Sequence, residues 1–243
     1  MSKATYLRAE IVRTFRNRRF LLFSLGFPLV LFLAVGGANK DRSLSGIGFA
    51  LYYMSGMVAW GSMVAIVSSG ARISTERQTG WTRQLRITPL RTRTYFTAKI
   101  VCGYLLALLT IVVLYVAGLF LDVHLRVSEW ATMTGLVLVG LVPFAVLGVL
   151  LGHLVKPDSL GPAVGGITSL FALLGGAWGP LGSSRVLTDA AKCLPSFWLV
   201  QSAKVVLHGP AWPPAEEWVV LAVWTLALGR LAVLVYQRDT ARV

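Results

Sequence analysis

Charged residues are scarce in this sequence, and acidic ones are scarcest. Asp, Glu, Lys and Arg together make up 14% of the 243 residues, and only ten residues are acidic, whereas 56% are hydrophobic. The mean hydropathy is +0.69. So few charges are far from the composition of an ordinary water-soluble domain. The composition therefore predicts an integral membrane protein, with little chain left for a separate soluble domain.

Residues that carry enzymatic chemistry are also few. No lysine follows a glycine, so the Gly-Lys-Ser/Thr step of a phosphate-binding loop is missing. The three histidines lie in separate segments, which argues against a clustered metal site. Cys102 and Cys193 are expected near opposite faces of the bilayer, too far apart for a disulfide. We expect no catalytic, cofactor-binding or metal-binding residue on this chain.

Apolar stretches, by contrast, are long and frequent. A helix needs about 20 apolar residues to cross a hydrocarbon core of roughly 30 Å. The sequence predicts an all-α integral membrane protein with six transmembrane helices in one domain, 1–243. An interfacial amphipathic helix is expected over 4–19, and a re-entrant or interfacial hairpin on the external side over 185–215, where prolines interrupt the apolar pattern. The spans are predicted at about residues 20–38, 46–71, 98–121, 130–155, 159–182 and 217–237.

The distribution of basic residues predicts the orientation. Of the 23 lysines and arginines, 17 fall on the side of the two termini and of the loop between the second and third predicted spans. Cytoplasmic loops are enriched in Lys and Arg, so both termini are expected in the cytoplasm of a multi-pass protein of the cell membrane. This topology also accounts for the net charge of +13, and we expect no nucleic-acid partner.

The N-terminal stretch has the pattern of a helix lying on the membrane surface. Leu7, Ile11 and Phe15 recur at a spacing of four, with several arginines around them. This spacing predicts an amphipathic helix that contacts membrane lipid on the cytoplasmic side. The alternative is a basic leader that only sets the topology.

The loop at 72–97 carries the most specific motif. Glu76 is followed by Gly80 and Trp81, then by Leu85 and Pro89. Glu76 is expected to end a continuous helix, Gly80 to allow a close turn, and Pro89 to stop a short helix that begins at Trp81. The alternative is an ordinary basic loop that follows the charge rule alone.

This motif resembles that of the membrane subunits of type-2 ABC exporters, and Glu76, Gly80, Leu85 and Pro89 match its spacing. Trp81 departs from it, because the family often has threonine after the glycine. The resemblance extends to the interfacial helix, the six spans and the hairpin before the last span. It implies that the short helix couples the spans to a separate ATPase, which would bind the ATP and Mg²⁺ that this chain lacks.

The resemblance also implies a permease subunit that pairs with a second copy of itself or with a sister permease, and that is not itself an enzyme. Its predominantly apolar spans suit efflux of a hydrophobic or amphipathic compound, such as a drug, an antibiotic or a lipid-like molecule, so that antibiotic resistance is one expected role. Two other functions stay open at this stage. One is a non-transporting sensor or assembly subunit that uses the same basic loop, and the other is a secondary carrier.

Overall fold

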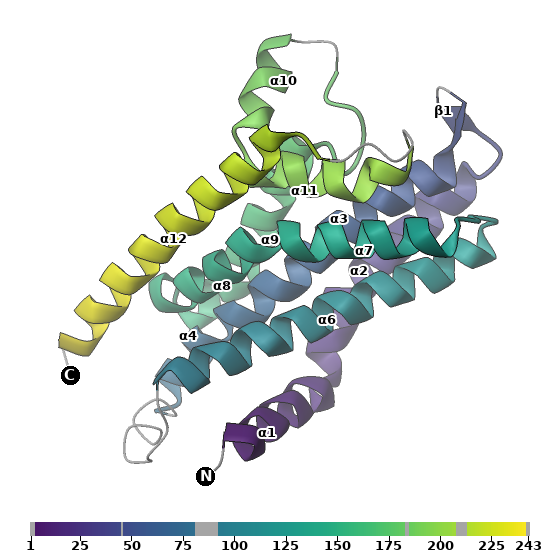
Figure 1. Ribbon diagram of the computed structural model, residues 1–243. Helices are drawn as coiled ribbons and strands as arrows, with labels where there is room; N and C mark the ends of the chain where they lie inside the picture. The colour runs from purple at the N-terminus through teal and green to yellow at the C-terminus, as the bar shows by residue number, and fades with distance from the viewer. Residues whose placement is uncertain (1–2, 45, 81–91, 183–184, 208–212, 242–243) are drawn as a thin grey trace.

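The computed structural model describes residues 3–44, 46–80, 92–182, 185–207 and 213–241, and almost all of this part of the chain is helical (Figure 1). The prediction of an all-α fold is confirmed, with one small addition: Ser43–Leu44 (β1) and Ile47–Gly48 (β2) form an antiparallel hairpin. The helices are α1 (Lys3–Arg16), α2 (Arg18–Leu31), a π-helical turn (Phe32–Gly36), α3 (Phe49–Ala71), α4 (Ile73–Gln78), α6 (Thr92–Phe120), α7 (Val127–Gly140), α8 (Val142–Leu154), α9 (Pro157–Gly175), α10 (Arg185–Lys192), α11 (Pro195–Lys204), a 3₁₀ turn (Val205–Leu207) and α12 (Ala215–Ala241).

The number of membrane spans differs from the prediction. Among the described residues, four continuous helices are long and apolar enough to cross a bilayer: Phe49–Gln78, Arg93–Phe120, Val127–Leu154 and Ala215–Gln237. A fifth candidate arises only if α1 and Phe20–Gly36, which meet at 71°, are counted as one bent span. The prediction of six spans is therefore not confirmed, because α9 is not among these helices and the span predicted at 20–38 qualifies only together with α1.

Two helices begin or end at other residues than the predicted spans do. The third span was predicted from 98, whereas α6 begins at Thr92 within the described residues, and its Lys99 pairs with Glu10 and Glu76 of other helices. The fifth span was expected to reach 182, yet α9 ends at Gly175. Gly176 has a φ of +74°, a left-handed conformation that ends the helix and that glycine adopts without steric cost.

α3 lies at the centre of the bundle and packs against α2, α6, α8, α9 and α11. Its contact with α8 brings the two backbones together. A Cβ atom on Gly70 would lie 2.6 Å from the Gly148 carbonyl carbon, and one on Gly148 would lie 2.6 Å from the Val67 carbonyl oxygen. Small residues allow such close helix packing. Membrane helices depend on it, because lipid tails are as apolar as the side chains and the hydrophobic effect does not drive the helices together.

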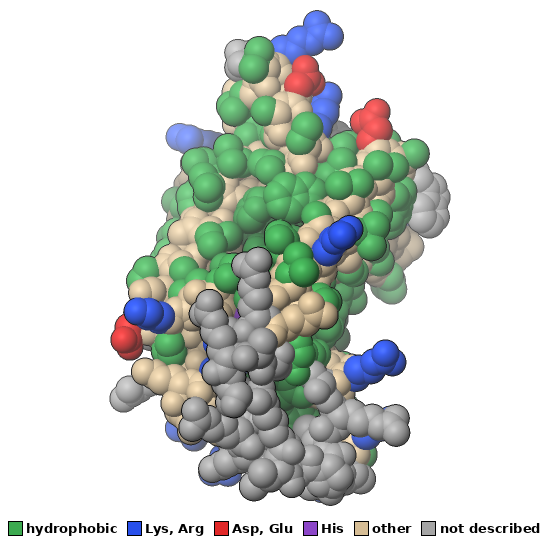
Figure 2. Space-filling view, turned by 90° about the vertical axis from the view of Figure 1, so that its left-hand side faces the viewer, with side chains coloured by type: hydrophobic (Ala, Val, Ile, Leu, Met, Phe, Trp, Pro, Cys, Tyr) green, Lys and Arg blue, Asp and Glu red, His purple; other side chains and the backbone are tan. Residues whose placement is uncertain are grey.

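The two ends of the bundle carry different elements. Figure 1 shows α1, α4 and both termini toward one end, and α10 and the β1–β2 hairpin toward the other. Figure 2 shows a face on which hydrophobic side chains cover the middle, while most of the visible Lys, Arg, Asp and Glu side chains lie toward the two ends. This arrangement fits a protein whose middle contacts lipid tails.

Candidate functional site

The predicted coupling motif begins at the end of the helix that contains α3 and α4. α4 (Ile73–Gln78) continues α3 past Arg72, and Thr79 caps it. Gly80 follows with a φ of +74°, so the chain turns there in a conformation that favours glycine. Glu76 lies in the last turn of α4. Three predicted coupling residues, Trp81, Leu85 and Pro89, lie outside the described residues.

Glu76 is the centre of a buried charged cluster built from three helices. Its Oε1 atom lies 2.5 Å from Lys99 Nζ on α6 and 3.1 Å from an Arg13 guanidinium nitrogen on α1. The Tyr95 hydroxyl of α6 donates to its Oε2 at 2.7 Å. Lys99 Nζ also lies 2.5 Å from Glu10 Oε1 of α1. We call Glu10, Arg13, Glu76, Tyr95 and Lys99 the Glu76 cluster.

The centre of the cluster is almost free of solvent, whereas the Arg13 side chain at its edge is 44% exposed. Glu76 and Lys99 are each 1% exposed, and Glu10 is 3% exposed. A buried charge is tolerated only when it is paired and hydrogen-bonded. Two carboxylates here face one ammonium and one guanidinium, so the formal charges of the cluster balance. Removing either Glu76 or Lys99 would therefore leave an unpaired charge in a dry site.

α4 is also fixed to the end of α8 by two hydrogen bonds on either side of Glu76. The Ser74 hydroxyl donates to the Val155 carbonyl oxygen at 2.5 Å, and Arg77 donates to the His153 carbonyl oxygen at 2.7 Å. These carbonyls lie at a helix C-terminus, where intrahelical partners are lacking. Glu76 and its neighbours thus connect α4 directly to α1, α6 and α8.

An aromatic group extends this connection to the last helix. The rings of Phe96 on α6, His153 on α8 and Tyr236 on α12 lie 5.5 to 6.1 Å apart by their centroids. Aromatic pairs at this separation in edge or tilted geometry add to the packing energy. The end of α4, the start of α6 and the ends of α8 and α12 are therefore held together at the same end of the bundle.

Sequence reasoning missed most of the Glu76 cluster. Glu10 was not singled out at all, and Lys99 was counted only as a basic residue that sets topology. Glu76 was assigned to the loop at 72–97, whereas both Glu76 and Lys99 are buried in helices that qualify as candidate spans. Composition could have indicated Glu10 as a candidate partner for a basic residue, because it is one of only ten acidic residues and lies between Arg8 and Arg13.

The predicted interfacial stripe has a partly different environment from the one its spacing suggested. Leu7, Ile11 and Phe15 are half-buried, and Leu7 and Phe15 pack against the hydrophobic core of the protein. The most buried residues of α1 are Tyr6, Glu10 and Thr14. α1 therefore packs against α6 mainly through Tyr6, Glu10 and Thr14 rather than through the predicted apolar stripe. Contact of the stripe with membrane lipid stays a prediction.

Comparison with known proteins decides the family. The model of the family described as "ABC-2 family transporter protein" matches residues 37–234, which is most of the chain. The chain belongs to the ABC-2 family. It is also similar to the protein named "Putative transport permease YvfS" of Bacillus subtilis (strain 168), with 29% identity over 210 residues that cover 84% of this chain and 85% of that protein.

Membership explains why ATPase chemistry is missing from the sequence. ABC-2 permeases are membrane subunits that work with an ABC ATPase subunit and are not themselves enzymes. This ABC-2 permease is accordingly a multi-pass membrane protein. Its Glu76 cluster lies next to the one loop for which the sequence motif predicted contact with that ATPase.

Proposed function

We propose that this ABC-2 permease exports a hydrophobic or amphipathic compound across the cell membrane, and that the Glu76 cluster transmits the movement of the ATPase to the spans. The proposed orientation places both termini and the 72–97 segment in the cytoplasm, where the ATPase binds its ATP and Mg²⁺. The preference of Lys and Arg for the cytoplasmic side supports this orientation. So does the position of both termini and α4 toward one end of the bundle (Figure 1).

One observation carries the coupling proposal. The Glu76 carboxylate binds Lys99 and Tyr95 of α6 and Arg13 of α1, while Ser74 and Arg77 bind the end of α8. A load applied at residues 81–91 reaches α4 through Gly80 and α6 through Thr92. Contacts of this density would pass the load to three other helices rather than let α4 bend alone.

An aromatic group supports an apolar or amphipathic substrate. Trp60 of α3 lies between Phe27 of α2 and Trp178, with ring centroids 5.6 Å and 5.3 Å apart. Phe27 is 56% exposed and Trp178 is 38% exposed, so the group forms part of the outer surface. Pockets that bind drug-like molecules are lined mainly by hydrophobic and aromatic side chains with a few polar groups. An antibiotic, another drug or a lipid-like molecule fits this chemistry.

The proposed assembly contains a second permease, either another copy or a sister chain. α9 supports this part of the proposal, because Gly161, Gly165 and Gly166 are exposed and a Cβ atom on any of them would meet no atom within 4 Å. Exposed small residues on a helix allow another helix to approach closely.

The experiment compares Glu76→Gln with Glu216→Gln. The first variant keeps an oxygen acceptor for Tyr95 but removes the buried charge, whereas Glu216 is an exposed residue at the start of α12. Each variant is purified with its ATPase, reconstituted in vesicles and assayed for ATP hydrolysis and for movement of a panel of hydrophobic compounds. We expect Glu76→Gln to lower the number of molecules moved per ATP about ten-fold or more, and Glu216→Gln to match the wild type.

Three results would contradict the proposal. Equal transport per ATP in both variants would remove the coupling role from Glu76. Transport that continues after nucleotide is depleted would indicate a secondary carrier. Tight association with an ATPase without any substrate movement would favour a sensor or assembly subunit. Elution volume and melting temperature of both variants are measured first, so that a folding defect is recognised.

A further inference from the structure

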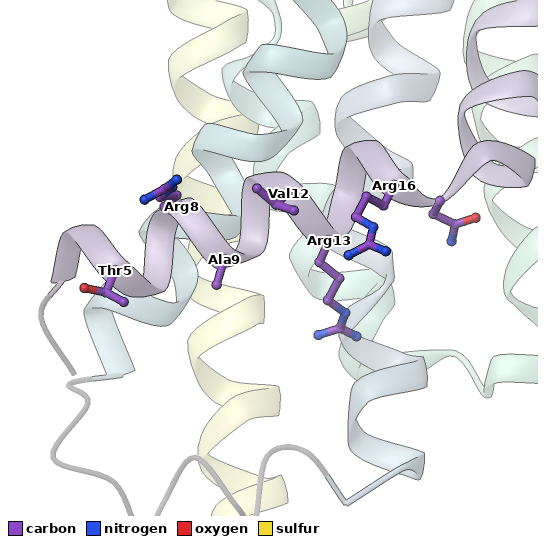
Figure 3. A pocket seen from close by; sticks show the side chains of 7 residues that line it. Thr5, Arg8, Ala9, Val12, Arg13 and Arg16 are labelled. Carbon is purple, nitrogen blue, oxygen red and sulfur yellow. The ribbon is translucent and has the colours of Figure 1, made fainter.

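α1 carries an open groove on the side that faces away from the bundle. The groove has a volume of about 690 Å³ and is lined by one face of the helix: Thr5, Arg8, Ala9, Val12, Arg13, Arg16 and Asn17. Figure 3 shows these side chains on the outer face of α1, with Arg13 and Arg16 extending to the same side. We call this surface the α1 groove.

The described part of the protein leaves the α1 groove open on one side. α1 uses its opposite face for packing, where Tyr6, Glu10 and Thr14 are buried against α6. In the groove, by contrast, Arg8 and Arg16 are exposed, and Val12 is 46% exposed. The packing of α1 therefore consumes one side of the helix and leaves the arginine side available to a ligand.

The position of α1 places the groove at the level of lipid headgroups. α1 meets the following helical segment, Phe20–Gly36, at 71°, so it runs across the direction of that segment rather than along it. Just beyond the bend, Leu22 and Phe27 are 70% and 56% exposed, as expected of side chains in contact with lipid tails. The groove ends at Asn17, where this lipid-facing stretch begins.

The chemistry of the groove selects an anion. Three of its seven lining residues are arginines, and none of the seven is acidic. A guanidinium group binds a phosphate through two parallel hydrogen bonds and is more weakly hydrated than an ammonium group. Ala9 and Val12 lie between the arginines and offer an apolar floor, which a free phosphate ion does not need but the glycerol part of a lipid does.

From this geometry we propose that the α1 groove binds the phosphate headgroup of an anionic phospholipid from the leaflet in which α1 lies. Arg8 and Arg16, toward the two ends of the groove, attract the negative headgroup, and Ala9 and Val12 between them contact the glycerol part (Figure 3). Arg13 belongs both to the groove and to the Glu76 cluster, because its guanidinium lies 3.1 Å from Glu76 Oε1 and 3.9 Å from Glu10 Oε2. A headgroup in the groove would therefore compete with Glu76 for Arg13.

That competition would make coupling sensitive to lipid composition, a consequence that rests on the proposed function. Headgroup binding does not rest on it, so the test measures binding alone. The full-length permease in neutral detergent is titrated with dioctanoylphosphatidylglycerol or dioctanoylphosphatidylcholine, and bound lipid is counted by native mass spectrometry. The variant is Arg8→Gln with Arg16→Gln, which leaves Arg13 and its ion pairs in place.

The matched control is Arg42→Gln with Arg126→Gln, which removes two exposed arginines outside α1 and the same amount of charge. Each arginine near an anionic surface contributes about a five-fold gain in affinity. We expect the α1 variant to lose roughly 25-fold in affinity for the phosphatidylglycerol, and the control to lose less than about two-fold. Phosphatidylcholine is expected to bind weakly to all three proteins. Arg8→Lys with Arg16→Lys should keep most of the binding, because the charge remains.

Three outcomes would overturn the proposal. Equal phosphatidylglycerol affinity in the α1 variant and the control would show that the arginines do not form the site. Displacement of the lipid by inorganic phosphate at the same concentration would identify a free anion as the ligand. Unchanged lipid binding combined with loss of the ATPase in a pull-down would identify the groove as a protein contact.

Discussion

Lys99 and Glu76 form an ion pair that almost no solvent reaches, with Nζ 2.5 Å from Oε1 and each residue 1% exposed. Lys99 holds Glu10 at the same time. Lys99→Met would leave two buried carboxylates without their shared cation. We expect it to lower the free energy of unfolding by roughly 3 to 5 kcal/mol, measured by thermal or denaturant unfolding in detergent.

The control for this prediction is Lys192→Met. Lys192 pairs with Asp189 at 3.1 Å, but their side chains are 46% and 59% exposed. An exposed pair contributes at most about 1 kcal/mol. Equal destabilisation by the two variants would mean that burial does not decide the strength of the Glu76 cluster.

The sequence predicted the local features around Glu76 but not its cluster. The four-residue spacing of Glu76 and Gly80 is local, and local spacing predicts a helix end and a turn. Glu10 and Lys99 are 89 residues apart, and nothing in either neighbourhood distinguishes a buried lysine from one that only sets topology. Tertiary packing decides that difference, so no local pattern carries it.

Helix ends also depend on more than hydropathy. The span predicted at 98–121 contains Lys99, and the carboxylates of Glu10 and Glu76 accommodate this charge inside α6. The reverse holds at Gly176, where the chain stays uncharged while its backbone turns into the left-handed region. Hydropathy reports which residues tolerate lipid, whereas partners and backbone conformation decide where a helix ends.

Gly80 allows a sharper test of the coupling proposal than loss of a side chain. Its φ is +74°, and a Cβ atom there would meet nothing within 4 Å. Gly80→Ala therefore changes only the backbone preference, by about 1 to 2 kcal/mol against the left-handed conformation. Asn tolerates that conformation better. We expect Gly80→Ala to lower substrate moved per ATP in reconstituted vesicles, and Gly80→Asn to keep most of it.

Equal transport per ATP in the alanine and asparagine variants would contradict a role for this turn. Gly80→Ala is expected to lower the free energy of unfolding by no more than the cost of the left-handed conformation, about 1 to 2 kcal/mol, and Gly80→Asn by less. A larger loss of stability would mean that Gly80 acts through folding instead.

The α3–α8 crossing depends on glycine for space. A Cβ atom on Gly70 would lie 2.6 Å from the Gly148 carbonyl carbon and 2.7 Å from the Val149 nitrogen, and backbone atoms do not move aside easily. We expect Gly70→Ala to destabilise the protein by about 1 to 3 kcal/mol in detergent. Gly135→Ala is the control, since Gly135 is exposed on α7 with no atom within 4 Å of a Cβ. There, alanine should stabilise the helix by up to about 1 kcal/mol.

Lys204 provides a test by pH at the other end of the bundle. Its Nζ donates to the Tyr52 hydroxyl and to the Gly176 carbonyl oxygen, both at 2.9 Å, and lies 4.1 Å from the centroid of the Tyr52 ring. The residue is 7% exposed. Burial lowers the pKa of Lys204 from 10.5 to about 8, because the charged form loses its hydration.

Because the pKa of Lys204 is lower in the folded protein than in the unfolded chain, the free energy of unfolding depends on pH. Between pH 8 and 10.5 the unfolded chain binds a proton at Lys204 that the folded protein has lost, so stability rises with pH in this window. Below pH 8 both states are protonated, and the cost of burying the charge is fully present. Relative to Lys204→Met, the wild type should gain about 2 kcal/mol in the free energy of unfolding between pH 7.5 and 9.5. Lys192→Met, at an exposed lysine, should follow the wild-type profile.

If the difference between wild type and Lys204→Met stayed constant across this range, Lys204 would keep its proton throughout, and its bonds to Tyr52 and Gly176 would outweigh the cost of burial.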